Sequence, residues 1–118
     1  YFFDSYAIIE IIKGNPHYEP YKKSSIIITQ LNLFEVYQSV LELLGEQQAD
    51  IFIEMYSPFV FEFQNDMIKQ AAMMRLKYKK RNISMTDCMR YCVAKQLGIR
   101  FLTGDKEFEH FENVEWVK

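Results

Sequence analysis

The chain has 118 residues, of which 49% are hydrophobic and 16% aromatic, enough apolar surface for one domain with its own core. A charged fraction of 25% with only 4 Gly and 3 Pro excludes disordered and collagen-like chains. The formal net charge of −2 excludes a molecule that is basic overall. We expect a single domain over residues 1–118 and no membrane span. No export signal is visible and there are only two cysteines, so we expect a cytoplasmic location.

Strands and helices alternate along the whole chain. Short apolar, β-branched or aromatic runs predict strands, whereas apolar residues at helical spacing, stopped by Gly or Pro, predict helices. In chain order we expect a strand at 1–3, a helix at 5–13, a short helix at 17–23, a strand at 25–29, helices at 31–44 and 47–56, a strand at 59–63, helices at 64–80 and 84–97, a strand at 99–102, one or two helical turns at 105–111 and a strand at 114–117. This alternation predicts an α/β fold with three α/β/α layers and a mostly parallel central sheet of about five strands.

The predicted helices have apolar faces that should pack on the sheet. For the 31–44 helix we expect the buried face to contain Leu31, Phe34, Leu41 and Leu44, with Val40 beside them. In the 84–97 helix, Cys88 and Cys92 stand four residues apart, and buried free thiols are the expected state.

Four acids fall near the ends of predicted elements. Asp4 ends the first strand, Glu35 lies in the helix after the 25–29 strand, Asp87 opens the helix before the 99–102 strand, and Asp105 follows that strand. Open parallel sheets bind ligands at the carboxyl ends of their strands, and all four acids can reach that edge. Because clustered carboxylates repel one another, they need cations, and Mg²⁺ or Mn²⁺ suits oxygen ligands best.

Each acid also has an ordinary structural interpretation. Asp4 and Asp105 could cap the helices that follow them, Asp87 has capping-box spacing after Ser84, and Glu35 could be a solvated helix residue. Capping explains the four together less easily than it explains each alone. The metal-site hypothesis requires that the four carboxylates share one pocket and are not neutralised by arginine or lysine.

The order of these acids resembles that of the PIN domain family of metal-dependent ribonucleases. The resemblance covers nearly the whole chain, and its most specific part runs from Ile83-Ser84-Met85-Thr86-Asp87 to Leu102-Thr103-Gly104-Asp105. It includes a helix-borne Asp, the small residue Ala94, the helix-ending Gly98 and a strand that leads into Thr-x-Asp-x-x-Phe. The length is that of single-domain VapC-type toxins.

The resemblance implies a PIN-like fold and a Mg²⁺- or Mn²⁺-dependent endoribonuclease that is the toxin of a VapBC-type toxin–antitoxin pair. It implies that the catalytic and metal-binding residues are Asp4, Glu35, Asp87 and Asp105, supported by Ser5 and Thr103. Hydrolysis would leave a 5′-phosphate and a 3′-hydroxyl. The partners it implies are RNA, an antitoxin protein and a second copy of the chain in a homodimer.

A basic segment lies at the C-terminal end of the predicted 64–80 helix. We expect Lys77, Lys79, Lys80 and Arg81 to contact RNA phosphates, although basic residues also favour the C-terminal end of any helix. His17 and His110 are isolated in the sequence, and we expect both on the surface.

Three other functions are compatible with the sequence. The chain could be an RNA-processing PIN nuclease outside any toxin–antitoxin pair, or a PIN module that binds RNA without cleaving it. It could also be a receiver-like Mg²⁺-binding phosphoacceptor domain. However, a receiver needs paired acids after its first strand and a phosphoacceptor Asp after its third. Here Asp4 stands alone, and Gln64-Asn65 follow the 59–63 strand.

Overall fold

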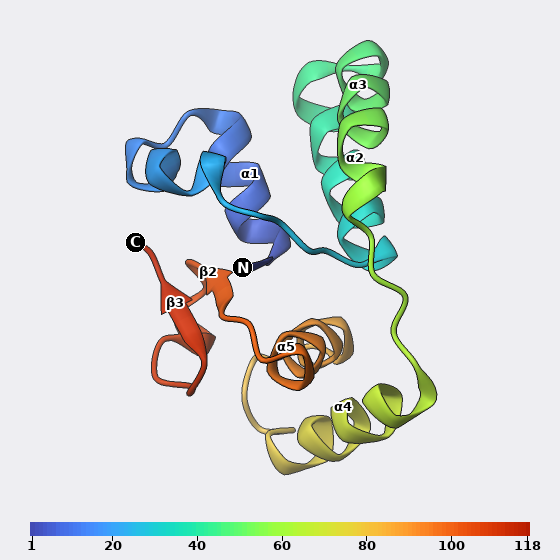
Figure 1. Ribbon diagram of the computed structural model, residues 1–118, viewed down its shortest axis with the longest axis vertical. Coiled ribbons are helices and arrows are strands. Elements are labelled where there is room, and N and C mark those ends of the chain that lie inside the picture. Colours follow the sequence, from blue (N-terminus) through green and yellow to red (C-terminus); the bar gives the residue numbers. More distant parts are fainter.

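A computed structural model describes all residues 1–118, and its helices end within three residues of the predicted positions (Figure 1). The elements are β1 (Phe2–Phe3), α1 (Ser5–Lys13), the 3₁₀ helix η1 (Pro16–Lys23), α2 (Gln30–Leu44), α3 (Glu46–Tyr56), the 3₁₀ turn η2 (Ser57–Phe59), α4 (Asn65–Lys77), α5 (Met85–Leu97), β2 (Phe101–Thr103), the 3₁₀ turn η3 (Lys106–Phe108) and β3 (Val114–Trp116). None of the helices combines the length and the apolar character that crossing a membrane requires.

The central sheet is parallel throughout. Its three strands lie in the order β1-β2-β3, with Phe2 opposite Phe101 and Phe101 opposite Val114. The two other predicted strands, 25–29 and 59–63, extend the sheet beyond β1 only as single parallel bridges, Phe2 to Ile27 and Ile28 to Val60. Because η2 occupies residues 57–59, the predicted 59–63 strand has little extended chain left for pairing.

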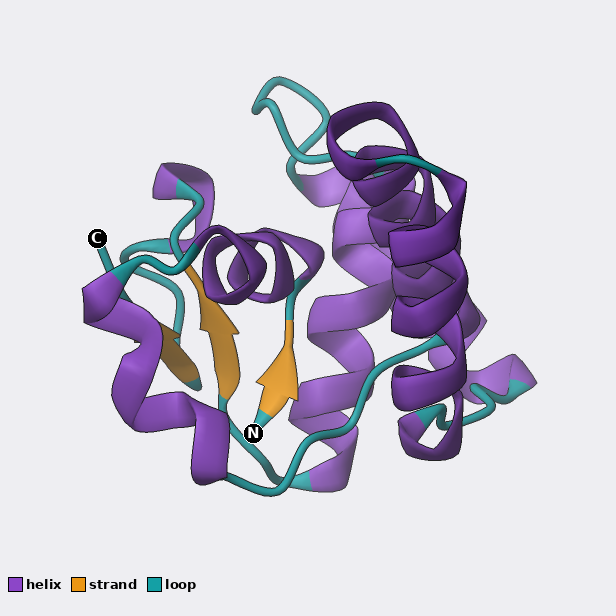
Figure 2. Cartoon of the chain, turned by 90° about the horizontal axis from the view of Figure 1, so that it is seen from above, coloured by secondary structure: helices purple, strands orange, loops and turns teal.

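Helices cover both faces of the sheet (Figure 2). Successive side chains of a strand point to opposite faces, and the burial follows this rule. Phe2 and Phe101 pack with α4 and α5 on one face, whereas Phe3 and Leu102 pack with α1, α2 and α3 on the other. The predicted α/β/α layering is therefore confirmed.

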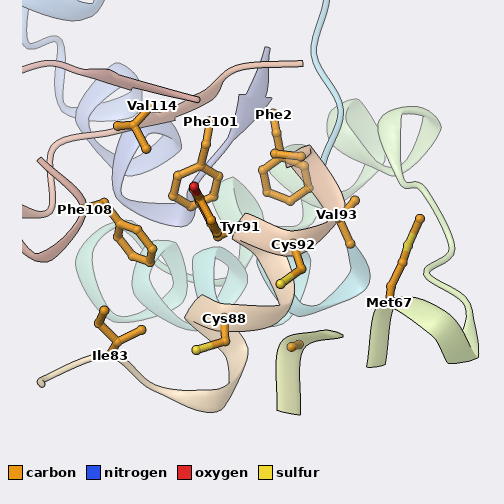
Figure 3. Close-up of a cluster of buried hydrophobic side chains, with 12 residues drawn as sticks. Phe2, Met67, Ile83, Cys88, Tyr91, Cys92, Val93, Phe101, Phe108 and Val114 are labelled. Atoms are coloured by element: carbon orange, nitrogen blue, oxygen red, sulfur yellow. The ribbon is translucent and has the colours of Figure 1, made fainter. Parts of the chain in front are cut away.

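The core between the sheet and α5 contains a group of packed aromatic rings (Figure 3). The rings of Phe2 and Phe101 stack with their centroids 5.7 Å apart, and Tyr91 meets Phe101 edge-on at 5.8 Å. Cys88 and Cys92 lie buried on α5 as free thiols, as expected. Burial raises the pKa of the Cys88 thiol to about 11.

The predicted buried face of α2 is wrong. Phe34 is 71% exposed, and Leu41 and Leu44 are also exposed. The residues of α2 that are buried instead are Asn32, Leu33, Val36 and Val40, so Val40 alone of the predicted set is fully in the core. Since α2 carries apolar residues on two sides, periodicity cannot choose between them. The buried face of α2 is the one that carries Asn32, whose side chain donates a hydrogen bond to the main-chain oxygen of Phe3.

Candidate active site

Asp4 leaves the end of β1 and is held rigidly. Its carboxylate is 4% exposed. One oxygen, Oδ1, accepts the main-chain N–H of Ser5 at 2.9 Å, and the other, Oδ2, accepts the hydroxyl of Thr103 at 2.7 Å. Burial raises the pKa of Asp4 to about 6, against the opposing effects of the Arg90 charge and the Thr103 hydrogen bond. The strand end therefore presents a carboxylate that needs a positive charge.

Thr103 connects Asp4 with Asp105. It ends β2, which is the neighbour of β1, and its hydroxyl oxygen also accepts the main-chain N–H of Asp105 at 3.1 Å. The Asp105 carboxylate accepts the N–H of Glu107 at 3.0 Å and begins η3. The capping interpretation of Asp105 is therefore correct, and its link to Asp4 runs through Thr103.

Glu35 reaches the same edge from the second turn of α2. Its Oε1 accepts the hydroxyl of Ser5 at 2.8 Å. The Ser5 hydroxyl in turn accepts the side-chain amide of Asn32 at 3.1 Å, and that amide also donates to the Phe3 main chain. The other end of the Asn32 amide accepts the main-chain N–H and the hydroxyl of Thr29. Sequence reasoning missed Asn32, although the spacing Thr29-x-x-Asn32 at a helix start signalled such a pair.

Asp87 serves two partners. Its Oδ2 accepts the main-chain N–H of Ser84 at 3.0 Å, and the Ser84 hydroxyl accepts the N–H of Asp87 at 3.1 Å, which completes the predicted capping box. Its other oxygen, Oδ1, faces the acidic cluster and accepts from Arg90 at 2.6 Å. The capping interpretation of this acid is therefore correct, and its other oxygen still faces the acidic cluster.

Arg90 lies at the centre of the cluster, and no sequence argument identified it. Its Nε donates to Asp4 Oδ1 at 3.2 Å, its Nη1 to Glu35 Oε1 at 2.6 Å and its Nη2 to Asp87 Oδ1 at 2.6 Å. The only available signal was its position three residues after Asp87, which puts both side chains on one face of α5.

The structure thus brings Asp4, Glu35 and Asp87 together and connects Asp105 to them through Thr103. Contrary to the expectation, an arginine lies among the acids, but its single positive charge balances only one of the three carboxylates that it contacts. With Arg90 between them, no three acid, His or Cys side chains are arranged to hold one metal ion. The donor set itself fits Mg²⁺ or Mn²⁺, because every donor is a carboxylate oxygen and three of the carboxylates already share one cation.

The basic segment at the end of α4 divides into two parts. Arg81 donates to the main-chain oxygen of Glu107 at 2.6 Å and to its carboxylate, and its guanidinium stacks over Phe111 at 5.0 Å. Arg81 therefore ties the end of α4 to η3. The remaining members, Lys77, Lys79 and Lys80, are exposed, as are both histidines.

The fold and the site together define an α/β/α domain with an acidic cluster at the carboxyl edge of a parallel sheet. The sequence model of the PIN domain matches residues 1–114, and the chain belongs to the PIN domain family. The predicted resemblance is therefore confirmed.

Two solved structures share this fold. One is a toxin–antitoxin complex from Klebsiella pneumoniae, with a TM-score of 0.77 and 18% identity over 97% of this chain and 94% of that one. The other is Mycobacterium tuberculosis VapC20, described as a sarcin-ricin loop cleaving toxin, with a TM-score of 0.79 and 18% identity over 99% of this chain and 98% of that one. No curated protein sequence matches the chain.

Proposed function

We propose that this protein is a metal-dependent endoribonuclease that hydrolyses RNA phosphodiester bonds, and that it is the toxin of a VapBC-type pair. Membership in the PIN family and two toxin-system structures of the same fold support this function. The observation that carries it is that Asp4, Glu35 and Asp87 converge at the carboxyl edge of the sheet, where all three contact the guanidinium of Arg90.

The ion would be held by Asp4, Glu35, Asp87 and Asp105. When bound, Mg²⁺ or Mn²⁺ supplies a Lewis acid that makes water nucleophilic near neutral pH and neutralises charge on a phosphate. The chain's own residues orient the donors. The Ser5 hydroxyl fixes Glu35, and the Thr103 hydroxyl fixes Asp4 and the loop that carries Asp105.

The first test is RNA cleavage with Mn²⁺ by the wild type and by Asp4→Asn. The asparagine keeps the shape but removes the charge of the most buried ligand. We expect a loss of more than about tenfold, because even changes around metal ligands cost that much. A suitable first substrate is the sarcin-ricin loop, which the mycobacterial toxin is described as cleaving.

Asp66→Asn is the matched control, because Asp66 is an exposed acid at the start of α4. It should cleave like the wild type. Equal cleavage by the wild type and Asp4→Asn would show that the proposed site is wrong.

We propose that Lys77, Lys79 and Lys80 bind RNA phosphates, whereas Arg81 acts mainly by holding η3. The double variant Lys79→Glu/Lys80→Glu should weaken RNA binding in a filter or gel assay and leave Mn²⁺ binding unchanged. A matched pair, Lys13→Glu/Lys23→Glu, makes the same charge change at the far ends of α1 and η1. If both double variants lose RNA affinity equally, the loss comes from the change in net charge and not from this basic segment.

An antitoxin and a homodimer are the proposed protein partners. Exposed large apolar side chains on α2 and α4 support them, among them Leu43, Leu44, Met73 and Leu76. Light scattering should give twice the chain mass of 14.2 kDa. A monomer at all accessible concentrations would contradict the homodimer.

The alternatives within the PIN family differ in testable ways. A PIN module without catalysis would bind RNA and leave it intact with either ion. An RNA-processing nuclease would cleave RNA, but its gene would have no small antitoxin frame beside it. Membership in the PIN family gives no support to the receiver-like alternative, which would form a stable aspartyl phosphate with a phosphoryl donor.

A further inference from the structure

Arg90 is a buried cation inside the proposed metal site. Its side chain is 3% exposed, and three of its nitrogens donate to three different acids. Charge-assisted hydrogen bonds of this kind are among the strongest in proteins. The guanidinium is therefore the internal counterion of the cluster.

The oxygens that hold Arg90 are the ones a metal ion would need. Asp4 Oδ1, Glu35 Oε1 and Asp87 Oδ1 all accept from it, and the second oxygen of Asp4 is bound to Thr103 and that of Asp87 to Ser84. A small divalent ion needs its ligands at about 2.0–2.1 Å from one point. A planar guanidinium instead holds each carboxylate oxygen against a different one of its nitrogens. The same three oxygens cannot adopt both arrangements at once.

The charge balance favours replacement of the arginine. Three carboxylates surround one positive charge, and Asp105 adds a fourth carboxylate beyond Thr103. Uncompensated buried charge is costly, and a divalent ion brings twice the charge of a guanidinium. The cluster is therefore held together by a cation that only partly neutralises it.

The three acids around Arg90 differ in how exposed they are. Its Nε faces the deeply buried Asp4, whose side chain is 5% exposed, but its two terminal nitrogens face Asp87 and Glu35, which are 18% and 40% exposed. The head of the side chain, although buried, therefore lies toward the more exposed members of the cluster. Rotation of the flexible stem can carry it into solvent without moving α5.

We propose that Arg90 is an intramolecular competitor for the divalent ion, so that the metal binds only when the guanidinium leaves the three carboxylates. This inference rests on the proposed function, since it concerns the metal site of the nuclease. Arg90 holds the acids in place in the metal-free protein and lowers the metal affinity. The nuclease is thereby inactive at low metal concentration.

The test is calorimetric titration of the full chain with Mn²⁺. Arg90→Ala should bind Mn²⁺ at least about tenfold more tightly than the wild type, the effect of losing one charge-assisted competing contact. Arg90→Lys keeps the charge but lacks the planar fork of the guanidinium, and its Mn²⁺ affinity should lie between those of the wild type and Arg90→Ala. Arg100→Ala is the matched control, because Arg100 pairs with Glu115 outside the cluster, and its affinity should equal that of the wild type.

Thermal unfolding provides a second measurement that does not depend on activity. Arg90→Ala leaves the carboxylates without a counterion, so its melting temperature should fall in a chelator and rise more with Mn²⁺ than that of the wild type. The double variant Asp4→Asn/Arg90→Ala should lose this larger rise in melting temperature with Mn²⁺. That loss would locate the bound ion at Asp4.

Unchanged or weaker Mn²⁺ affinity in both Arg90 variants would overturn the inference. If the wild type still cleaves RNA with Mn²⁺, the proposed function survives that result. Unchanged Mn²⁺ affinity with lost cleavage would assign Arg90 to the RNA substrate instead, and also overturns the competition. If no variant binds Mn²⁺ or cleaves RNA, the proposed function fails together with the inference.

Discussion

Thr103 joins two neighbouring strand ends with one hydroxyl. It donates to the buried Asp4 carboxylate and accepts the N–H of Asp105. Thr103→Val keeps the shape but leaves both groups without this partner, so we expect the free energy of unfolding to fall by about 1–3 kcal/mol. Urea unfolding at neutral pH measures this change. Thr103→Ser keeps the hydroxyl, so its free energy of unfolding should fall clearly less than that of Thr103→Val. Equal losses in the two variants would mean that the methyl group and not the hydroxyl matters.

Cys88 combines burial with a high pKa. The thiol is fully buried on α5, and burial raises its pKa to about 11 from the ordinary value of 9.0. Only the thiolate reacts with iodoacetamide, so a raised pKa lowers the reactive fraction at pH 8. We expect the folded protein to resist alkylation there and both cysteines to react in denaturant, as mass spectrometry would show. Rapid modification of Cys88 in the folded protein would contradict its placement.

At the scale of elements, Asn32 connects α2 to β1. It is fully buried, and its amide makes hydrogen bonds at both ends, to Thr29 on one side and to Phe3 and Ser5 on the other. Asn32→Ala should lower the free energy of unfolding by about 2–4 kcal/mol, because several buried polar groups lose their partners. Circular dichroism during urea unfolding measures the loss.

Gln38→Ala is the matched control for Asn32→Ala, because Gln38 is exposed on the same helix. Its effect should stay within about 0.5 kcal/mol. A similarly small effect of Asn32→Ala would mean that the amide does not orient α2.

The sequence predicted elements better than it predicted contacts. Glycine and proline stops placed the helices, and the positions of Asp4, Glu35, Asp87 and Asp105 at one sheet edge followed from the topology of a parallel sheet. The buried face of α2 could not be chosen, because both of its sides are apolar. The place of Arg90 could not be read either. Whether an arginine on a helix points into solvent or into an acidic pocket depends on residues more than fifty positions away, such as Glu35.

At the scale of the whole molecule, Gly104 lies where three distant segments meet. A Cβ at this position would lie 2.5 Å from the Tyr18 hydroxyl and 2.7 Å from the main-chain oxygen of Val117, and it would also clash with the ring of Tyr6. Tyr18 cannot move aside easily, because its hydroxyl donates to that same Val117 oxygen at 2.7 Å. The absence of a side chain at Gly104 therefore permits η1, α1 and the segment after β3 to close around the end of β2.

Gly104→Ala should therefore be strongly destabilising, by about 2–4 kcal/mol. Gly98→Ala gives the comparison: Gly98 has a φ of +69° but open space around it, so only the backbone conformation is penalised, by about 1 kcal/mol. Differential scanning calorimetry of the two variants should rank Gly104→Ala as the less stable. The reverse order would mean that the three segments can separate at little cost.

The acidic cluster also has a consequence for the order in which its parts come together. Its members enter the polypeptide at positions 4, 35, 87 and 105, and Arg90 comes late among them. During translation, Asp4 and Glu35 can meet first, because Ser5 donates to both of their carboxylates. Asp87 and Arg90 follow on α5, and Thr103 arrives with β2, which pairs with β1. The cluster is therefore complete only after β2 and the Asp105 that follows it have been synthesised.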